Sequence, residues 1–200
     1  GKIWTKTVGT QHIFRLDLKT GKWERFHPTD FLPADKVKGA SIYQVISDSQ
    51  NNLWMAEFTA GHIGKIDAKT TKVTWWPFPT PNARGRRMNI DEQDRIIVTE
   101  YRGNKVAAFD TRAEKFTEYD LPAHTYPYRA NFDKNGEIWA STMHTDRVVR
   151  LDPKTGSTVQ YLMPSDPNMR TVFFDSSTTP PTFWVGSNHD HRVVKVEPLD

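Results

Sequence analysis

Cysteine is absent from this sequence of 200 residues. Its absence excludes disulfide bonds, thiolate metal sites and cysteine nucleophiles together, but it does not fix the cellular compartment. No stretch approaches the roughly 18 consecutive apolar residues that a membrane-spanning helix requires, so we expect no membrane span. The net charge is only +3, which is too small to indicate a nucleic-acid partner.

Helical periodicity is also missing, and apolar residues make up only 36% of the chain. Aromatic residues nevertheless reach 12%, with seven tryptophans. A disordered chain is poor in aromatic residues. The composition therefore predicts a folded protein whose core is built from aromatic and β-branched side chains.

The sequence repeats itself, and two independent markers give the same period. Both advance in steps of 50, 43, 42 and 45 residues. One marker is an apolar, mostly tryptophan position, and the other is an acid that ends the following apolar run: Trp4, Trp54, Ile97, Trp139, Trp184, and Asp17, Asp67, Asp110, Asp152, Glu197. The longer first step is explained by an expected loop, HPTDFLPADKVKGA, at residues 27–40.

Each repeat contains four short strand-like runs separated by turn residues, as in RMNID, RIIVTEY, KVAAFD and KFTEYDLP. Four strands per roughly 42–45 residues is typical of a β-propeller blade. We therefore predict an all-β fold, a β-propeller of four-stranded antiparallel blades. About five repeats are present within a single domain over residues 1–200, and we place them near 1–42, 43–85, 86–127, 128–169 and 170–200.

The two ends of the chain are expected to be partial blades. The first residues read as the second strand of a blade and the last as the third, which gives 18 strands in all. An unpaired blade edge is a liability in a closed propeller. We therefore expect the chain to be the C-terminal portion of a longer propeller.

The acids between strands are expected to close turns. Asp48, Asp91, Asp133 and the Asp-x-Lys-Thr segments fit this role, since aspartate accepts hydrogen bonds from the backbone two residues on. The tryptophans of the repeat, Trp54, Trp139 and Trp184, and Ile97 at the equivalent position, are predicted to be buried blade-packing residues.

Candidate functional residues gather at the opposite end of the sheets, where strand one begins and strand two ends. We call this end the top face. All seven histidines map to it. The members proposed for function are Arg87, Tyr128, Arg129 and Arg170 at the starts of first strands, Glu57, Glu100 and Tyr101 at the ends of second strands, and His144 and His189 in the loops that follow.

These residue types suggest a metal site or its structural alternative. Glu57 and Glu100 occupy equivalent places in neighbouring repeats, and paired carboxylates suit Mg²⁺. A histidine nearby could act as a general base near neutral pH. The alternative is that Arg87 and Arg129 simply neutralise the two glutamates.

The repeated block Ile/Leu-Trp-x-x-Glu-Phe/Tyr-x-x-x-Lys-Ile/Val-x-x-x-Asp, followed by Thr-Glu-Tyr-x-Leu-Pro, resembles the streptogramin lyase family, also called virginiamycin B lyase-like. The resemblance covers essentially the whole chain. It implies a seven-bladed propeller and a Mg²⁺-dependent elimination that opens a cyclic depsipeptide or lactone at its ester. It also implies metal binding by Glu57 and Glu100, and a base role for His144 or His189.

Two hypotheses from different classes follow. One is a carbon–oxygen lyase that acts on a small-molecule substrate at the top face, with Arg87, Tyr101, Tyr128, Arg129 and Arg170 as substrate-binding residues. The other is a non-catalytic propeller that binds a small anionic ligand, a glycan or a partner protein there. The family's glutamate positions hold Thr142 and Ser187 in the later repeats. The oligomeric state is left open, and a periplasmic or secreted location is favoured over a cytoplasmic one.

Overall fold

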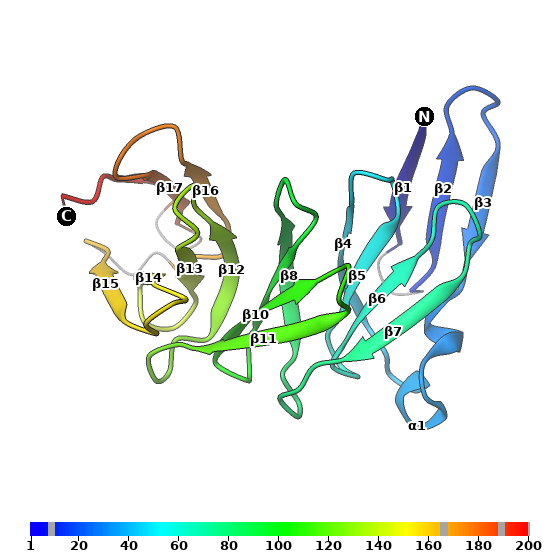
Figure 1. Ribbon diagram of the computed structural model, residues 1–200, viewed down its shortest axis with the longest axis horizontal. Coiled ribbons are helices and arrows are strands. Elements are labelled where there is room, and N and C mark those ends of the chain that lie inside the picture. Colours follow the sequence, from blue (N-terminus) through cyan, green and yellow to red (C-terminus); the bar gives the residue numbers. More distant parts are fainter. Residues whose placement is uncertain (8–10, 165–167, 188–190, 200) are drawn as a thin grey trace. The chain divides into compact units, whose positions relative to one another are not determined.

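The structure, a computed structural model, describes residues 1–7, 11–164, 168–187 and 191–199. It consists of β-strands joined by turns, together with two short helices (Figure 1). Among the described residues, no helix is long and apolar enough to cross a membrane. The all-β prediction is therefore confirmed.

The described strands form five antiparallel sheets of three, four, four, four and three strands. This total matches the 18 strands expected from the repeats. In chain order the sheets are β1 (Lys2–Lys6), β2 (Ile13–Asp17), β3 (Trp23–Phe26); β4 (Ile42–Ser47), β5 (Leu53–Glu57), β6 (His62–Ile66), β7 (Val73–Pro77); β8 (Gly85–Ile90), β9 (Ile96–Glu100), β10 (Lys105–Asp110), β11 (Lys115–Asp120); β12 (Pro127–Phe132), β13 (Ile138–Thr142), β14 (Arg147–Leu151), β15 (Thr158–Leu162); and β16 (Val172–Asp175), β17 (Thr182–Gly186), β18 (Val193–Val196).

Neighbouring strands in each sheet follow one another in sequence. Each sheet is thus a meander, the arrangement of a propeller blade. The expected loop at residues 27–40 contains a 3₁₀ turn, η1 (Pro28–Phe31), and a single helical turn, α1 (Ala34–Val37). Proline at the first helical position of η1 is suited to such a start, because its fixed φ is already helical.

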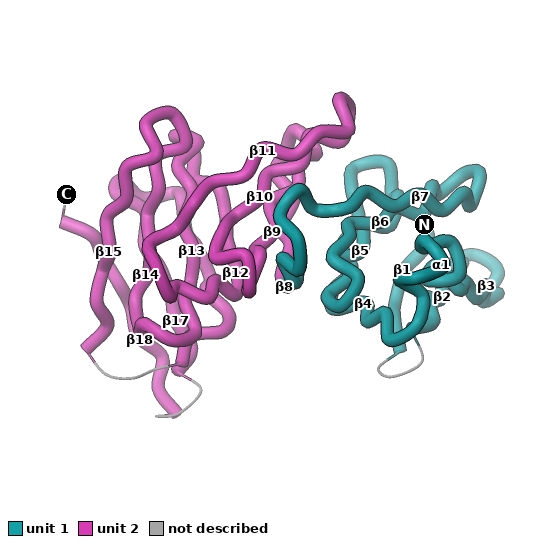
Figure 2. The backbone as a smooth tube through the Cα atoms, turned by 90° about the horizontal axis from the view of Figure 1, so that it is seen from below, with its two compact units in different colours: residues 1–86 teal, residues 87–200 magenta. Residues whose placement is uncertain are grey.

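The chain divides into two compact units, residues 1–86 and 87–200 (Figure 2). Unit 1 has its own core around Ile13, Ile42, Leu53, Met55 and Ile66. Unit 2 has two apolar clusters, one around Ile97 and Val149 and the other around Trp139 and Phe183. The single propeller domain over the whole chain stays a prediction.

The turn acids act as predicted. The carboxylate of Asp133 accepts the backbone N–H groups of Asn135 and Glu137, and its second oxygen accepts the indole N–H of Trp139 at 3.1 Å. In the same way, one oxygen of Asp48 accepts the backbone N–H groups of Gln50 and Asn52, and the other accepts the indole N–H of Trp54 at 2.9 Å. One aspartate therefore fixes both a tight turn and the side chain that packs the blade.

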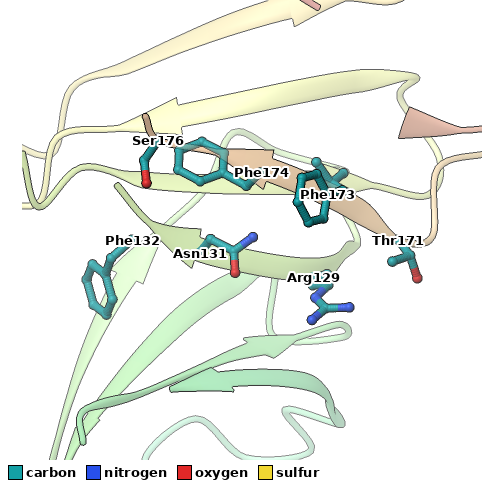
Figure 3. A pocket seen from close by; sticks show the side chains of 8 residues that line it. Arg129, Asn131, Phe132, Thr171, Phe173, Phe174 and Ser176 are labelled. Carbon is teal, nitrogen blue, oxygen red and sulfur yellow. The ribbon is translucent and has the colours of Figure 1, made fainter. Parts of the chain in front are cut away.

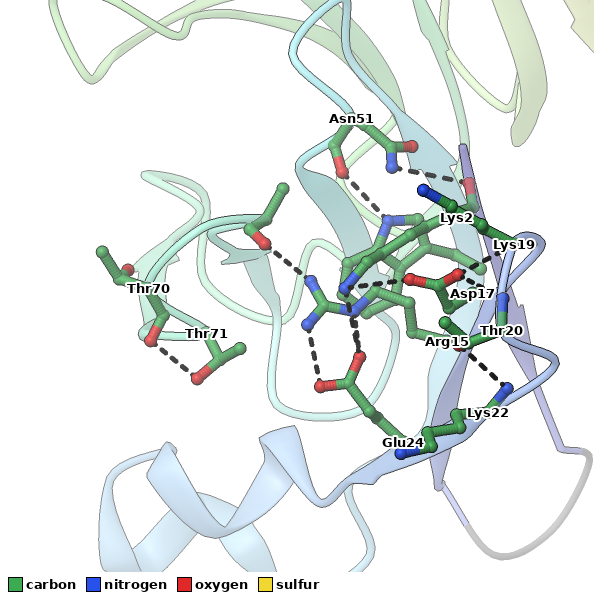
Figure 4. Close-up of polar contacts among 12 residues, drawn as sticks. Lys2, Arg15, Asp17, Lys19, Thr20, Lys22, Glu24, Asn51, Thr70 and Thr71 are labelled. Carbon is green, nitrogen blue, oxygen red and sulfur yellow. Dashed lines mark hydrogen bonds and ion pairs between the residues drawn. The ribbon is translucent and has the colours of Figure 1, made fainter.

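The tryptophan position is also covered by a basic residue from the next strand. Arg15, buried in unit 1, lies over the ring of Trp4 and makes a two-pronged ion pair with Glu24 (Figure 4). Its remaining nitrogen donates to the carbonyl of Ala68. The same stacking recurs in later sheets, in the pairs Lys65–Trp54, Arg150–Trp139 and Lys195–Trp184.

Burial follows the repeat prediction except in the last sheet. Trp54, Ile97 and Trp139 are at most 2% exposed, as predicted. The prediction for Trp184 is wrong, since this residue is 41% exposed. Trp54 stacks on Trp76, and Trp139 stacks on an aromatic residue of the fourth strand in the same way. The described part of the last sheet has three strands, and no fourth strand covers Trp184.

This difference predicts unequal costs for the same substitution. Trp139→Ala should lower the free energy of unfolding by about 3–5 kcal/mol, because it leaves a cavity in a packed cluster. Trp184→Ala should cost about 1 kcal/mol or less, as expected at a partly exposed site. Urea titration of both variants measures the two losses. Equal losses would contradict the difference in burial between Trp139 and Trp184.

Candidate active site

Three aromatic side chains meet at the top face of unit 2. Tyr101 directly follows β9, Tyr126 directly precedes β12, and His144 lies two residues beyond β13. The Tyr101 hydroxyl is 3.1 Å from His144 Nε2, and the Tyr126 ring centre is 4.6 Å from that of His144. His144 is exposed, so its ring is accessible to a ligand.

The loop before β12 is held in place by Asn104. The Asn104 side chain donates to the carbonyls of Leu121 and Pro122 at 2.9 Å each, and its oxygen accepts the Tyr126 N–H at 3.2 Å. Tyr126 has φ of 45°, a conformation that L residues rarely adopt and that costs free energy. The aromatic cluster is therefore positioned by a fixed loop rather than by a regular strand.

Two arginines occupy the start of β8 and β12. Arg87 lies over the ring of Tyr128, with its Nη2 3.4 Å from the tyrosine hydroxyl. Arg129 donates from Nη2 to Asn89 Oδ1 at 2.7 Å, and Asn89 in turn donates to the carbonyl of Ala130. Burial, and next the charge of Arg87, lower the pKa of Arg129. The structure thus places two positive charges at this end of unit 2.

Arg170 lies beside the same strand starts but is exposed. Its Nε donates to Asn168 Oδ1 at 3.4 Å, and its carbonyl accepts the Ser141 hydroxyl at 3.4 Å. Its guanidinium is therefore accessible at the surface.

Glu57 and Glu100, at the ends of second strands, are both buried. In unit 1, Glu57 accepts the backbone N–H groups of Ser41, Thr59 and Gly61, so both of its oxygens are engaged. Burial raises the pKa of Glu57, and these hydrogen bonds oppose that shift. In unit 2, Glu100 is fully buried. The hydrogen bond to Glu118 is the first cause that raises the pKa of Lys105, and the charge of Glu100 contributes after those of Glu118 and Asp120.

The contacts of Glu57 do not fit a Mg²⁺ site. A cation at Glu57 would have to displace backbone donors that the loop needs. Within the described ranges, no group of three or more histidine, cysteine or acidic residues is placed to hold a metal ion. Thr142, at the equivalent strand end, likewise binds the backbone, because its hydroxyl accepts the Arg147 N–H at 3.1 Å.

The other predicted site residues can be placed individually. His189 lies outside the described residues. Sequence reasoning proposed Tyr101, His144 and Arg129, but it missed Tyr126, which packs against His144, and Asn89, which accepts a hydrogen bond from Arg129. Tyr126 could have been found from the Tyr-Pro-Tyr-Arg segment, since it shares a short first-strand start with Tyr128 and Arg129.

The sequence matches the profile of the virginiamycin B lyase family over residues 33–198. The chain belongs to that family. A search of curated proteins found no match. The family profile covers four of the five sheets in full, including every unit 2 residue described above.

Solved structures of family members have the same fold. Selenomethionine-substituted virginiamycin B lyase from Staphylococcus aureus is 16% identical with a TM-score of 0.77, covering 100% of this chain and 67% of that chain. A streptogramin B lyase is 19% identical with a TM-score of 0.75, covering 100% of this chain and 66% of that chain. This virginiamycin B lyase-like chain thus spans about two thirds of the length of these lyases.

Similarity extends beyond lyases. The extracellular domain of a one component system from B. thetaiotaomicron is 20% identical with a TM-score of 0.69, covering 94% of this chain and 25% of that chain. The scaffold of the virginiamycin B lyase family is therefore shared with proteins of another kind, and the fold alone does not decide the activity.

The role of Glu57 can be tested directly. Glu57→Ala should lower the free energy of unfolding by about 2–4 kcal/mol, because buried backbone donors lose their acceptor. The loss should be the same with and without a chelator, as measured by urea titration. Glu92→Ala, at an exposed glutamate, is the control and should be nearly neutral. A wild-type protein that loses the same stability on chelation would indicate a metal at Glu57 instead.

Proposed function

We propose that this protein is a carbon–oxygen lyase that opens a cyclic ester, a lactone or a depsipeptide of the streptogramin B kind, by elimination. The single observation that supports this most is the Tyr101–His144 pair, which lies at the same end of unit 2 as Arg87 and Arg129. Family membership supports the same class of reaction.

The proposed reaction needs one base and no added water. His144 takes a proton from the carbon next to the one that bears the ester oxygen. The C–H electron pair forms a carbon–carbon double bond, and the C–O bond breaks with its electrons passing to the oxygen. The ring opens to a carboxylate, so the linear product has the same mass as the substrate.

Tyr101 would set the orientation and tautomer of the base. If His144 Nε2–H donates to the Tyr101 hydroxyl oxygen, Nδ1 is left as the proton acceptor. A neutral imidazole has one donor and one acceptor nitrogen, so a hydrogen bond at one fixes the role of the other. Tyr101 is therefore a positioning residue for His144, and the Tyr126 ring also packs against the His144 ring.

Arg87, Tyr128, Arg129 and Arg170 are proposed to bind the acyl oxygens. A guanidinium offers several N–H donors to a carbonyl that becomes a carboxylate during the reaction, and charge-assisted hydrogen bonds strengthen as that charge develops. The positive charge at this end of unit 2 would therefore stabilise the carboxylate that forms as the C–O bond breaks.

The Mg²⁺ requirement that the resemblance implies stays a prediction. Because the contacts of Glu57 do not fit a metal site, we route no step through a metal ion. Adding a chelator to the assay below tests the requirement without affecting the assignment of His144.

The test is an assay on a cyclic depsipeptide of the streptogramin B kind, read by mass spectrometry and ultraviolet absorbance. Elimination gives a linear product of unchanged mass with a new double bond, whereas hydrolysis adds the mass of one water. His144→Ala should lower kcat/KM about 10²–10⁴-fold, since it removes the general base. Tyr101→Phe should lower kcat more than it raises KM, because it affects the orientation of the base and not substrate binding.

His27→Ala is the matched control, since His27 is an exposed histidine outside this cluster, and its kcat/KM should equal that of the wild type. Turnover that survives His144→Ala unchanged would overturn the assignment of the base. Absence of an equal-mass product from every cyclic ester tried, with binding retained, would overturn the lyase proposal and favour the anion-binding alternative.

A further inference from the structure

A second feature of unit 2 lies between the first strands of its last two sheets. It is a pocket of about 360 Å³ on β12 and β16, and Figure 3 shows the side chains that line it. The polar lining residues are Arg129, Asn131, Thr171 and Ser176, and the apolar ones are Phe132, Val172, Phe173 and Phe174. Neither Tyr101 nor His144 is among them.

Arg129 is the positively charged residue that lines this pocket. Its Nη2 is taken by Asn89, but its Nε is buried and has no hydrogen-bond acceptor. No carboxylate among the residues that the structure describes forms an ion pair with it. Burial, and next the nearby charge of Arg87, disfavour the positive charge of Arg129 and lower its pKa. Arg129 lines the pocket, so its guanidinium can form charge-assisted hydrogen bonds with an anion there.

The apolar lining suits a ring or a bulky aliphatic group. Phe174 packs against Phe183 and Trp139, with ring centres 5.0 and 6.0 Å away, so its position is fixed by the core. Phe173 is 67% exposed and is free to contact a ligand. Aromatic side chains at a site give large contact areas with little loss of conformational freedom.

The size and the charge of the pocket narrow the ligand further. The volume is at the lower end of the range for small-molecule sites, which favours a ligand of amino-acid or short-peptide size. One arginine among otherwise uncharged lining residues matches a single negative charge, not a polyanion. The planar guanidinium also matches a carboxylate in geometry.

We propose that this pocket binds a small carboxylate joined to an aromatic or bulky apolar group, with the carboxylate on Arg129 and the apolar group against Phe173. Asn131 and Ser176 would supply further hydrogen bonds to the polar end. This proposal shares Arg129 with the proposed lyase site, but the binding requires neither turnover nor His144.

The test uses isothermal titration with 3-phenylpropionate and, as its neutral counterpart, 3-phenylpropionamide. The wild-type chain should bind the acid at least tenfold more tightly than the amide. Arg129→Gln should weaken the acid at least tenfold and leave the amide unchanged. Arg129→Lys should restore part of the difference, because lysine returns the charge without the planar geometry.

Three further variants separate the possible explanations. Phe173→Ala should weaken both probes, since it removes apolar contact. Arg112→Gln removes an exposed charge from a turn of the same unit and should leave both probes unchanged. His144→Ala should also bind both probes as the wild type does, so failure of the lyase proposal and failure of this one are distinguishable.

Unfolding midpoints of all variants check that each one folds. Equal binding of acid and amide by the wild type would overturn the proposal, as would an Arg129→Gln variant that folds and binds the acid unchanged. A loss of acid binding in Arg112→Gln equal to that in Arg129→Gln would also overturn it, because the effect would then be general electrostatics.

Discussion

The fold depends on one repeated contact, between a turn aspartate and the strand that follows it. In Asp133 a single carboxylate accepts backbone N–H groups of its turn and the indole N–H of Trp139. The turn conformation and the position of the largest core side chain are therefore set together. Because the turn fixes where the second strand begins, it also fixes which residues come at the far end of that strand.

This contact divides the work between the two ends of each sheet. At the turn end, carboxylates are used to satisfy the backbone. At the top face, Glu57 and Thr142, the last residues of their second strands, also accept hydrogen bonds from backbone N–H groups. The side chains that could bind or act on a ligand are Tyr101 and His144, one and two positions after the ends of their second strands, and the arginines near the starts of the first strands. A side chain at the end of a strand is tied to its own hairpin, whereas one beyond it is not.

The sequence was sufficient to predict most of the fold, because the repeat places equivalent residues in equivalent environments. The strand count, the turn role of Asp48 and the burial of Trp54 all follow from that periodicity. The failure at Trp184 has a physical cause: a repeat position specifies which face a side chain takes, but not whether a fourth strand covers it. Lys195 covers Trp184 as the repeat implies, and yet the ring remains partly exposed.

The candidate site was less accessible to sequence reasoning. The Tyr101–His144 contact joins residues of neighbouring repeats, and shared blade positions were enough to suggest it. The backbone role of Glu57 could not be predicted, because it depends on where loop N–H groups point and not on residue type. The same is true of Arg129: its arginine identity suggested an anion, but its partner Asn89 and the phenylalanines across the pocket come from strand packing.

The aspartate turns also couple folding to protons. Backbone hydrogen bonds from their turns are the first cause that lowers the pKa of Asp17, Asp67, Asp110 and Asp152 below the ordinary value of 3.8. A carboxyl group whose pKa is lower in the folded state stabilises the fold fully above its ordinary pKa, and this contribution is lost as the pH falls through the folded pKa. Because the same turn recurs in successive sheets, each of these four contributions is lost as the pH falls through the pKa of its aspartate in the folded state. Acidification therefore weakens the turn ends of several sheets together.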